Sequence, residues 1–307
     1  MNATNCTSEL ISLAMTTGTP EYLKRQAFLI ALTILALPLN WLEGYLESRT
    51  EIREHVKFIQ KTQRWTIYIF CFGFLKNHGA HFFRHLVHHG CDLLVESESC
   101  GIGNFFMNFA NKYLHFSMLA IVLTFYPNNF IMSWRNYKYN VALTTGYPLL
   151  FSIGLVCNHM ATSETLIASC MDYESEISRM RDLKFNLGCN ILSFAVFIAL
   201  FIWHMIKMEN PVLHLQISEH HFHTSMKKQM DLFLPNLMLF GYCFIPAQFQ
   251  MLYATDDFLY RLNALLMVPL YFVISPIVNI MKYFYQNRHL GFHRLIIEIL
   301  TPVRRVP

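Results

Sequence analysis

Six stretches without a single Asp, Glu, Lys or Arg constrain this chain more than any other feature of its sequence. A bilayer core of about 30 Å needs about 20 consecutive apolar residues in a helix, and each stretch is close to that length. We therefore predict a membrane-spanning helix in each. They cover residues 26–42, 113–132, 139–163, 185–206, 232–255 and 262–281.

A seventh span is predicted over residues 65–88, although its second half is polar. Residues 65–75 are apolar, and Lys76 and several histidines follow. Without this span, some 60 residues would connect the first helix to the stretch that ends at residue 132, and structureless loops of that length are uncommon in compact domains. The predicted fold class is an all-α membrane protein, a seven-transmembrane-helix bundle.

The chain divides into three regions around this bundle. Residues 1–22 form an extracellular amino terminus, residues 23–285 the bundle, and residues 286–307 a cytoplasmic tail. The tail spaces Phe292, Leu295, Ile296 and Ile299 at i, i+3, i+4 and i+7, which predicts a short amphipathic eighth helix at the membrane surface.

The amino-acid composition agrees with membrane insertion and excludes soluble, disordered and nucleic-acid-binding proteins. Hydrophobic residues make up 54% of the chain and charged residues 14%, too few to cover a soluble surface. Phe alone occurs 27 times, which excludes a disordered chain. The net charge of +4 is too small to indicate a surface that binds nucleic acid. The chain is expected to contact membrane lipid and no nucleic acid.

Two signals place the amino terminus outside a multi-pass cell-membrane protein. Asn2 and Asn5 each begin a glycosylation sequon, which is used only on the lumenal or outer side. With that orientation, the inner segments carry fifteen basic residues and the outer segments six, as the positive-inside rule requires.

The same topology divides the eight cysteines into two sets of four. Cys71, Cys157, Cys189 and Cys243 fall within helices and are expected to be small buried side chains. The other four lie outside, where disulfides persist, and allow three pairings among which the sequence does not choose. We favour Cys100 with Cys170, and Cys6 with Cys91.

Several short motifs carry a resemblance to a known family. Helix six contains Phe240, Cys243, Phe244 and Pro246 in an order similar to the F-x-x-C-W-x-P motif of rhodopsin-like receptors. Helix seven contains Pro276 and Asn279, a loose likeness of N-P-x-x-Y. Residues 5–10 and 91–95, followed by Cys100, resemble nematode chemosensory serpentine receptors of the class alpha and alpha/beta group.

This resemblance implies a chemosensory receptor in a sensory-neuron cilium that binds a small-molecule ligand and signals to a heterotrimeric G protein. Phe240, Cys243, Phe244, Pro246, Pro276 and Asn279 would form its conformational switch. The two prolines also predict kinks, because each deletes a helix hydrogen bond, although prolines occur in membrane helices for packing alone. Where relatives carry Glu-Arg at the inner end of helix three, this chain has residues 124–126, Thr-Phe-Tyr, which weakens the implied coupling.

The ligand is expected between the outer halves of helices two, three, five, six and seven. Lys112 is an intramembrane charge, and we expect it either to face an acidic or carbonyl-bearing ligand or to bond helix carbonyls. The histidines of helix two recur on one face and are read as polar lining, a ligand-contacting patch or a pH-sensitive patch. The predicted ligand-contact residues are His81, His85, Met107, Asn108, Asn111, Lys112 and Phe244.

Two other classes remain open. His81-x-x-x-His85, with residues 219–223, is similar to the histidine boxes of membrane di-iron hydroxylases and desaturases, but the topology places the two segments on opposite sides of the membrane. An odorant-gated cation channel of seven helices would have its amino terminus inside. We expect a receptor with no catalytic residue, no cofactor and no metal.

Overall fold

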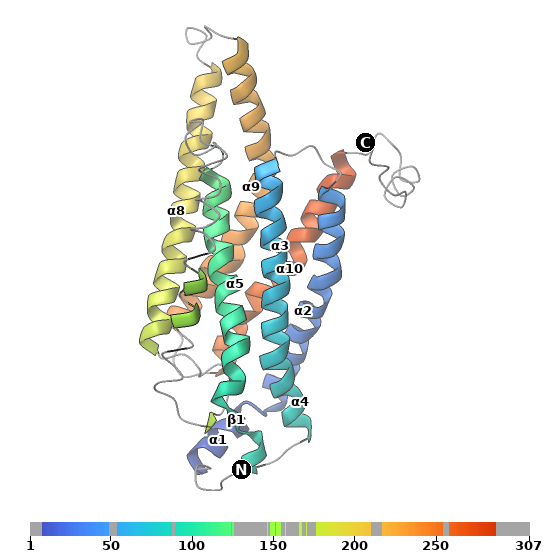
Figure 1. The fold of residues 1–307 in the computed structure, drawn as a ribbon, viewed down its shortest axis with the longest axis vertical. Coiled ribbons are helices and arrows are strands. Elements are labelled where there is room, and N and C mark those ends of the chain that lie inside the picture. The colour runs from blue at the N-terminus through green and yellow to red at the C-terminus, as the bar shows by residue number, and fades with distance from the viewer. Residues whose placement is uncertain are drawn as a thin grey trace.

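The computed structural model describes most of each predicted span except the fourth. Of the 307 residues, it describes 8–48, 54–87, 90–123, 125, 146, 148–150, 152–154, 157, 166–167, 170, 176–209, 217–253 and 258–286. Long helices run along one axis and form the body of the molecule (Figure 1). The long helices are α2 (Pro20–Glu47), α3 (Glu54–Phe74), α5 (Ser97–Leu123), α8 (Glu176–Glu209), α9 (Ile217–Tyr253) and α10 (Phe258–Gln286).

The long helices pack as a closed ring. Around the ring, α2 contacts α3, α3 contacts α5, α5 contacts α8, α8 contacts α9, α9 contacts α10, and α10 contacts α2. The apolar residues that these helices turn inward form one core, in which Phe74, Leu114, Phe240 and Phe272 are almost completely buried. Close van der Waals packing of these side chains holds the ring together.

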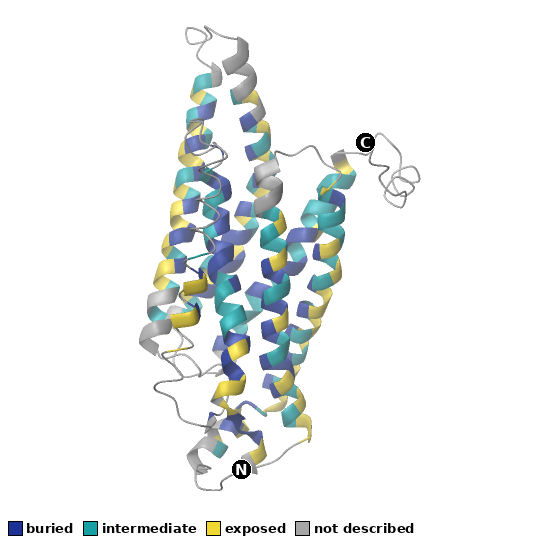
Figure 2. Ribbon diagram, in the orientation of Figure 1, coloured by how far each residue is buried: buried dark blue, intermediate teal, exposed yellow. Residues whose placement is uncertain are grey.

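Four of the described helices are long and apolar enough to cross a membrane. These segments are Pro20–Glu47, Leu183–Lys207, Met226–Met251 and Arg261–Tyr285. Figure 2 shows exposed positions along these helices. Large apolar side chains are among them, including Leu35, Trp41, Ile198 and Ile202. A surface of this kind suits lipid and not water, so the described chain fits an all-α membrane protein.

Short elements gather at the end of the ring where α2 begins, which we call the disulfide end. They are α1 (Ser8–Thr16), α4 (Ala80–Val87), the 3-10 turn η3 (Gly90–Leu93), β1 (Val95–Glu96) and β2 (Leu166–Ile167). The two strands pair antiparallel, with Val95 opposite Ile167. Thr19 caps α2 and Pro20 occupies its first turn, which fixes where α1 ends and α2 begins. The sequence reading missed α1.

The predicted Cys100–Cys170 disulfide is confirmed, with a Cα–Cα distance of 5.3 Å. It joins the start of α5 to the segment after β2. Cys71, Cys189 and Cys243 are buried as expected, whereas Cys157 is exposed and that expectation was wrong. Cys6, the side chain of Cys91, the sequons at Asn2 and Asn5, and the tail after residue 286 lie outside the described residues.

Candidate functional site

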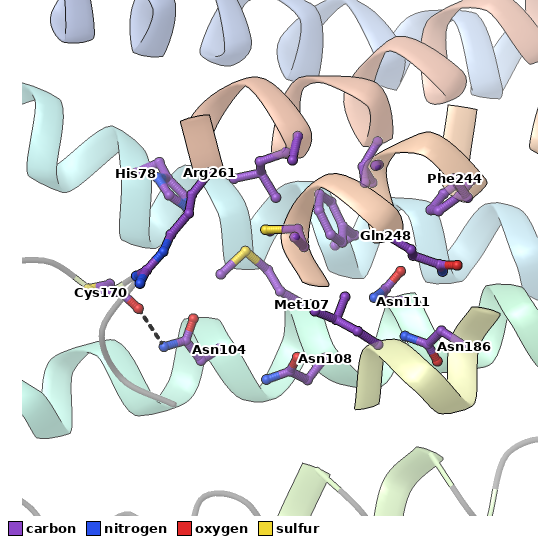
Figure 3. A pocket seen from close by; sticks show the side chains of 17 residues that line it. His78, Asn104, Met107, Asn108, Asn111, Cys170, Asn186, Phe244, Gln248 and Arg261 are labelled. Carbon is purple, nitrogen blue, oxygen red and sulfur yellow. Dashed lines mark hydrogen bonds between the residues drawn. The ribbon is translucent and has the colours of Figure 1, made fainter. Parts of the chain in front are cut away.

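A cavity of about 190 Å³ opens among the long helices near the disulfide end (Figure 3). It lies between α3, α5, α8, α9 and α10, and Cys170 closes one side, where the Asn104 amide donates to the Cys170 carbonyl at 3.1 Å. Its lining residues are Phe70, His78, Asn104, Met107, Asn108, Asn111, Cys170, Leu183, Asn186, Phe244, Ala247, Gln248, Met251, Arg261, Ala264, Leu265 and Val268.

The lining combines an apolar body with a few polar groups, as small-molecule sites usually do. Phe70, Phe244 and Val268 provide apolar walls. The amides of Asn and Gln side chains supply both donors and acceptors, and the buried Arg261 brings a cation, which extends past His78 toward Cys170 in Figure 3. Such a lining can hold an apolar molecule that also carries polar atoms.

Phe244 forms the floor of the cavity and belongs to a cluster of rings below it. Phe240 and Phe244 stack with ring centroids 4.4 Å apart. Both contact His115 of α5 and Tyr271 of α10 edge to face, at centroid distances of 5.1–5.4 Å. A change in the position of Phe244 would therefore alter the packing of α5, α9 and α10 against one another.

A polar chain crosses the ring at the same depth. Asn190 of α8 donates to Gln248 of α9 at 3.1 Å, and Gln248 contacts His115 of α5 at 2.5 Å. His115 in turn bonds the Asn111 carbonyl at 2.6 Å. Since Asn111 and Gln248 both line the cavity, this chain links the site to the helix interfaces.

Four of the predicted ligand-contact residues line the cavity: Met107, Asn108, Asn111 and Phe244. Lys112, His81 and His85 are not among its lining residues. Lys112 follows Asn111 on α5 but is only 2% exposed and buried within the ring. The expectation that Lys112 either faces a ligand or bonds helix carbonyls stays a prediction, and among the described residues Arg261 brings a cation to the cavity.

A π-helical turn explains why the histidines separate. The segment η2 (Leu75–Gly79) interrupts the helix between α3 and α4. One extra residue in the turn rotates every later side chain around the helix axis. His78, within η2, lines the cavity, while His81 and His85, which follow it, contact Thr17 beneath α1. A helical spacing of residues could not reveal this change of face.

The predicted switch residues fall into three places. Phe240, Phe244 and Cys243 are buried in the core, whereas Pro246 is exposed on the outer face of an uninterrupted α9. Pro276 is buried within α10. Asn279 accepts from Asn236 of α9 at 2.8 Å and donates to Glu43 of α2.

Asn279 leads to a polar network in the other half of the ring, which the sequence reading missed. Arg64 of α3 pairs with Glu47 of α2, one turn beyond Glu43. Asn40 donates to the Phe272 carbonyl at 2.8 Å. The four-residue spacing of Glu43 and Glu47 near the end of the first span was a usable signal, because buried carboxylates require partners.

A histidine contact joins Phe125, which follows α5, to α8 and α9. His204 of α8 bonds the Phe125 carbonyl at 3.0 Å through Nε2, and its Nδ1 lies 2.9 Å from His223 Nδ1 of α9. The contact joins the ends of α5, α8 and α9 away from the disulfide end. It also places His223 at the opposite end of the ring from His81, so the segments needed for a shared di-iron site lie apart.

The chain matches no family model, and no curated protein matches it.

Proposed function

We propose that this protein is a cell-surface receptor that crosses the membrane seven times, with its amino terminus outside and its disulfide end facing the exterior. A small molecule binds in the cavity, and movement of α9 passes the signal to a cytosolic heterotrimeric G protein. The chemosensory role and the ciliary location enter this proposal through the sequence resemblance.

The path of the chain supports seven crossings. Phe125, after α5, contacts His204 at the end away from the disulfide, while Leu166 and Ile167 pair with β1 at the disulfide end. The intervening chain thus connects opposite ends of the ring. The predicted fourth span, residues 139–163, has the length to do so.

The observation that carries the proposal is the position of Phe244. This residue touches the cavity on one side and the Phe240, His115 and Tyr271 rings on the other. A ligand that favours one packing of these rings over another would shift α9 relative to α5 and α10, since packed interfaces adopt discrete arrangements. The histidine contact among α5, α8 and α9 lies at the far end of the same helix.

The test is a ligand screen followed by paired substitutions. The full chain is expressed in a heterologous sensory cell with a surface tag, and volatile and water-soluble compounds are screened for a G-protein response. We expect Phe244→Leu to lower the potency of an identified agonist by roughly tenfold, equivalent to about 1.4 kcal/mol, because the floor of the cavity loses aromatic contact.

Phe249→Leu is the matched control, since it makes the same change on an exposed part of α9. It should leave both potency and surface delivery unchanged. Equal potency in the two variants at equal surface delivery would contradict binding in this cavity. A response that persists without G proteins would instead favour a ligand-gated channel.

A further inference from the structure

Three donor atoms form a nearly equilateral triangle beneath α1, outside the cavity. His81 Nε2 and His85 Nε2 lie 3.2 Å apart. The Thr17 hydroxyl oxygen lies 3.1 Å from His85 Nε2 and 3.4 Å from His81 Nε2. All three atoms therefore lie within 3.4 Å of one another.

The local fold holds each donor in place. His81 and His85 are four residues apart on α4, so their rings project from one face, with centroids 4.4 Å apart. Thr17 follows α1 and is anchored by its own bond to the Ala14 carbonyl at 2.7 Å. Tyr22 packs edge to face against His81.

The edges of this triangle match those of a zinc coordination sphere. Zinc binds imidazole nitrogen at roughly 2.0–2.1 Å in a tetrahedron, whose ligand atoms are then roughly 3.3 Å apart. Two histidines one turn apart on a helix are also a recurrent metal-binding pair. We propose that His81 and His85, with the Thr17 hydroxyl as third ligand, bind a divalent transition metal ion such as Zn²⁺ or Cu²⁺.

The Gln26 amide lies beside His81. It donates to the His78 carbonyl at 2.8 Å and lies 3.4 Å from His81 Nδ1. Metal binding at Nε2 requires the remaining proton of His81 on Nδ1, which faces this amide. Binding would therefore turn the Gln26 amide away from the His78 carbonyl, so that its Oε1, which has no hydrogen-bond partner among the described residues, accepts that proton.

The site would clamp α1 onto α4. His85 is half-buried, whereas His81 and Thr17 are buried at the disulfide end. Neither His81 nor His85 lines the cavity. A bound ion would therefore act on α1 and α4 and would not compete directly with a ligand. No group of three or more His, Cys, Asp or Glu side chains gathers as a metal site in the described ranges, so this site depends on the hydroxyl and on water.

The experiment measures zinc binding by the purified full chain without a polyhistidine tag. Zn²⁺ alone should raise the Tm in a saturable manner, because it binds only the folded state. His81→Ala and His85→Ala should each weaken Zn²⁺ binding on the order of tenfold or more. His223→Ala, which alters the other described histidine pair, should leave Zn²⁺ binding unchanged.

A second measurement needs no variant. Zn²⁺ should slow amide hydrogen exchange in α1 and α4 of the wild-type chain and leave the far ends of α8 and α9 unchanged. Absence of saturable stabilisation, protection confined to α8 and α9, or unchanged binding in a folded His85→Ala variant would each overturn the site. These readouts need no agonist or G protein, so they fail or succeed independently of the proposed function.

Discussion

Glycines allow α3 and α5 to approach closely, so a larger residue at this contact should destabilise the protein. A Cβ at Gly73 would lie 2.6 Å from the Gly103 carbonyl oxygen, which is backbone and cannot rotate away. We expect Gly73→Ala to force the helices apart at a cost of about 1–3 kcal/mol. The measurement is the Tm of the purified protein in detergent.

Gly188→Ala supplies the comparison, because a Cβ there would meet nothing within 4 Å. This variant should melt at the wild-type temperature or slightly above it, since alanine favours a helix over glycine. If the two variants melted together, the close approach of α3 and α5 would be wrong.

Individual site residues were predictable only where the helix was regular. Met107, Asn108 and Asn111 line the cavity because α5 continues without interruption from Cys100. His81 and His85 follow η2, which adds a residue to the turn, and they do not line the cavity. Spacing along a sequence cannot register such an insertion, since the side-chain pattern on either side remains helical.

At the scale of elements, the histidine contact should hold three helix ends together. The Phe125 carbonyl can only accept, so His204 Nε2 donates to it, His204 Nδ1 accepts, and His223 Nδ1 donates. His204→Ala removes both bonds, whereas His223→Ala removes one of them. We expect His204→Ala to cost about 1–3 kcal/mol of stability and His223→Ala less, measured as Tm.

The double variant gives the corresponding check. If the contact is real, the cost of removing both side chains should be close to that of His204→Ala alone, because the pair acts as a unit. Additive losses would show that the two histidines act separately. Under the proposed function, His204→Ala should also raise basal signalling.

Helix positions were predictable from uncharged stretches, while the contacts between helices were not. The predicted spans 26–42 and 262–281 fall inside α2 and α10. The bond between Asn279 and Glu43 joins residues 236 positions apart, and no local pattern specifies such a partner. The salt bridge between Arg64 and Glu47 likewise joins two helices.

On the scale of the whole molecule, an odd number of crossings places the two chain ends on opposite sides of the membrane. The proposed direction of signalling depends on this. The end of α5 and the strand β2 lie at opposite ends of the ring. The described helices alone therefore do not account for the path of the chain between them.

The most direct test of the account maps both ends in intact cells. A tag at the amino terminus should react with an impermeant antibody, Asn2 or Asn5 should carry glycan, and a tag after Pro307 should react only after permeabilisation. Both tags reactive from the same side of the membrane would contradict seven crossings, and the receptor proposal would fail with them.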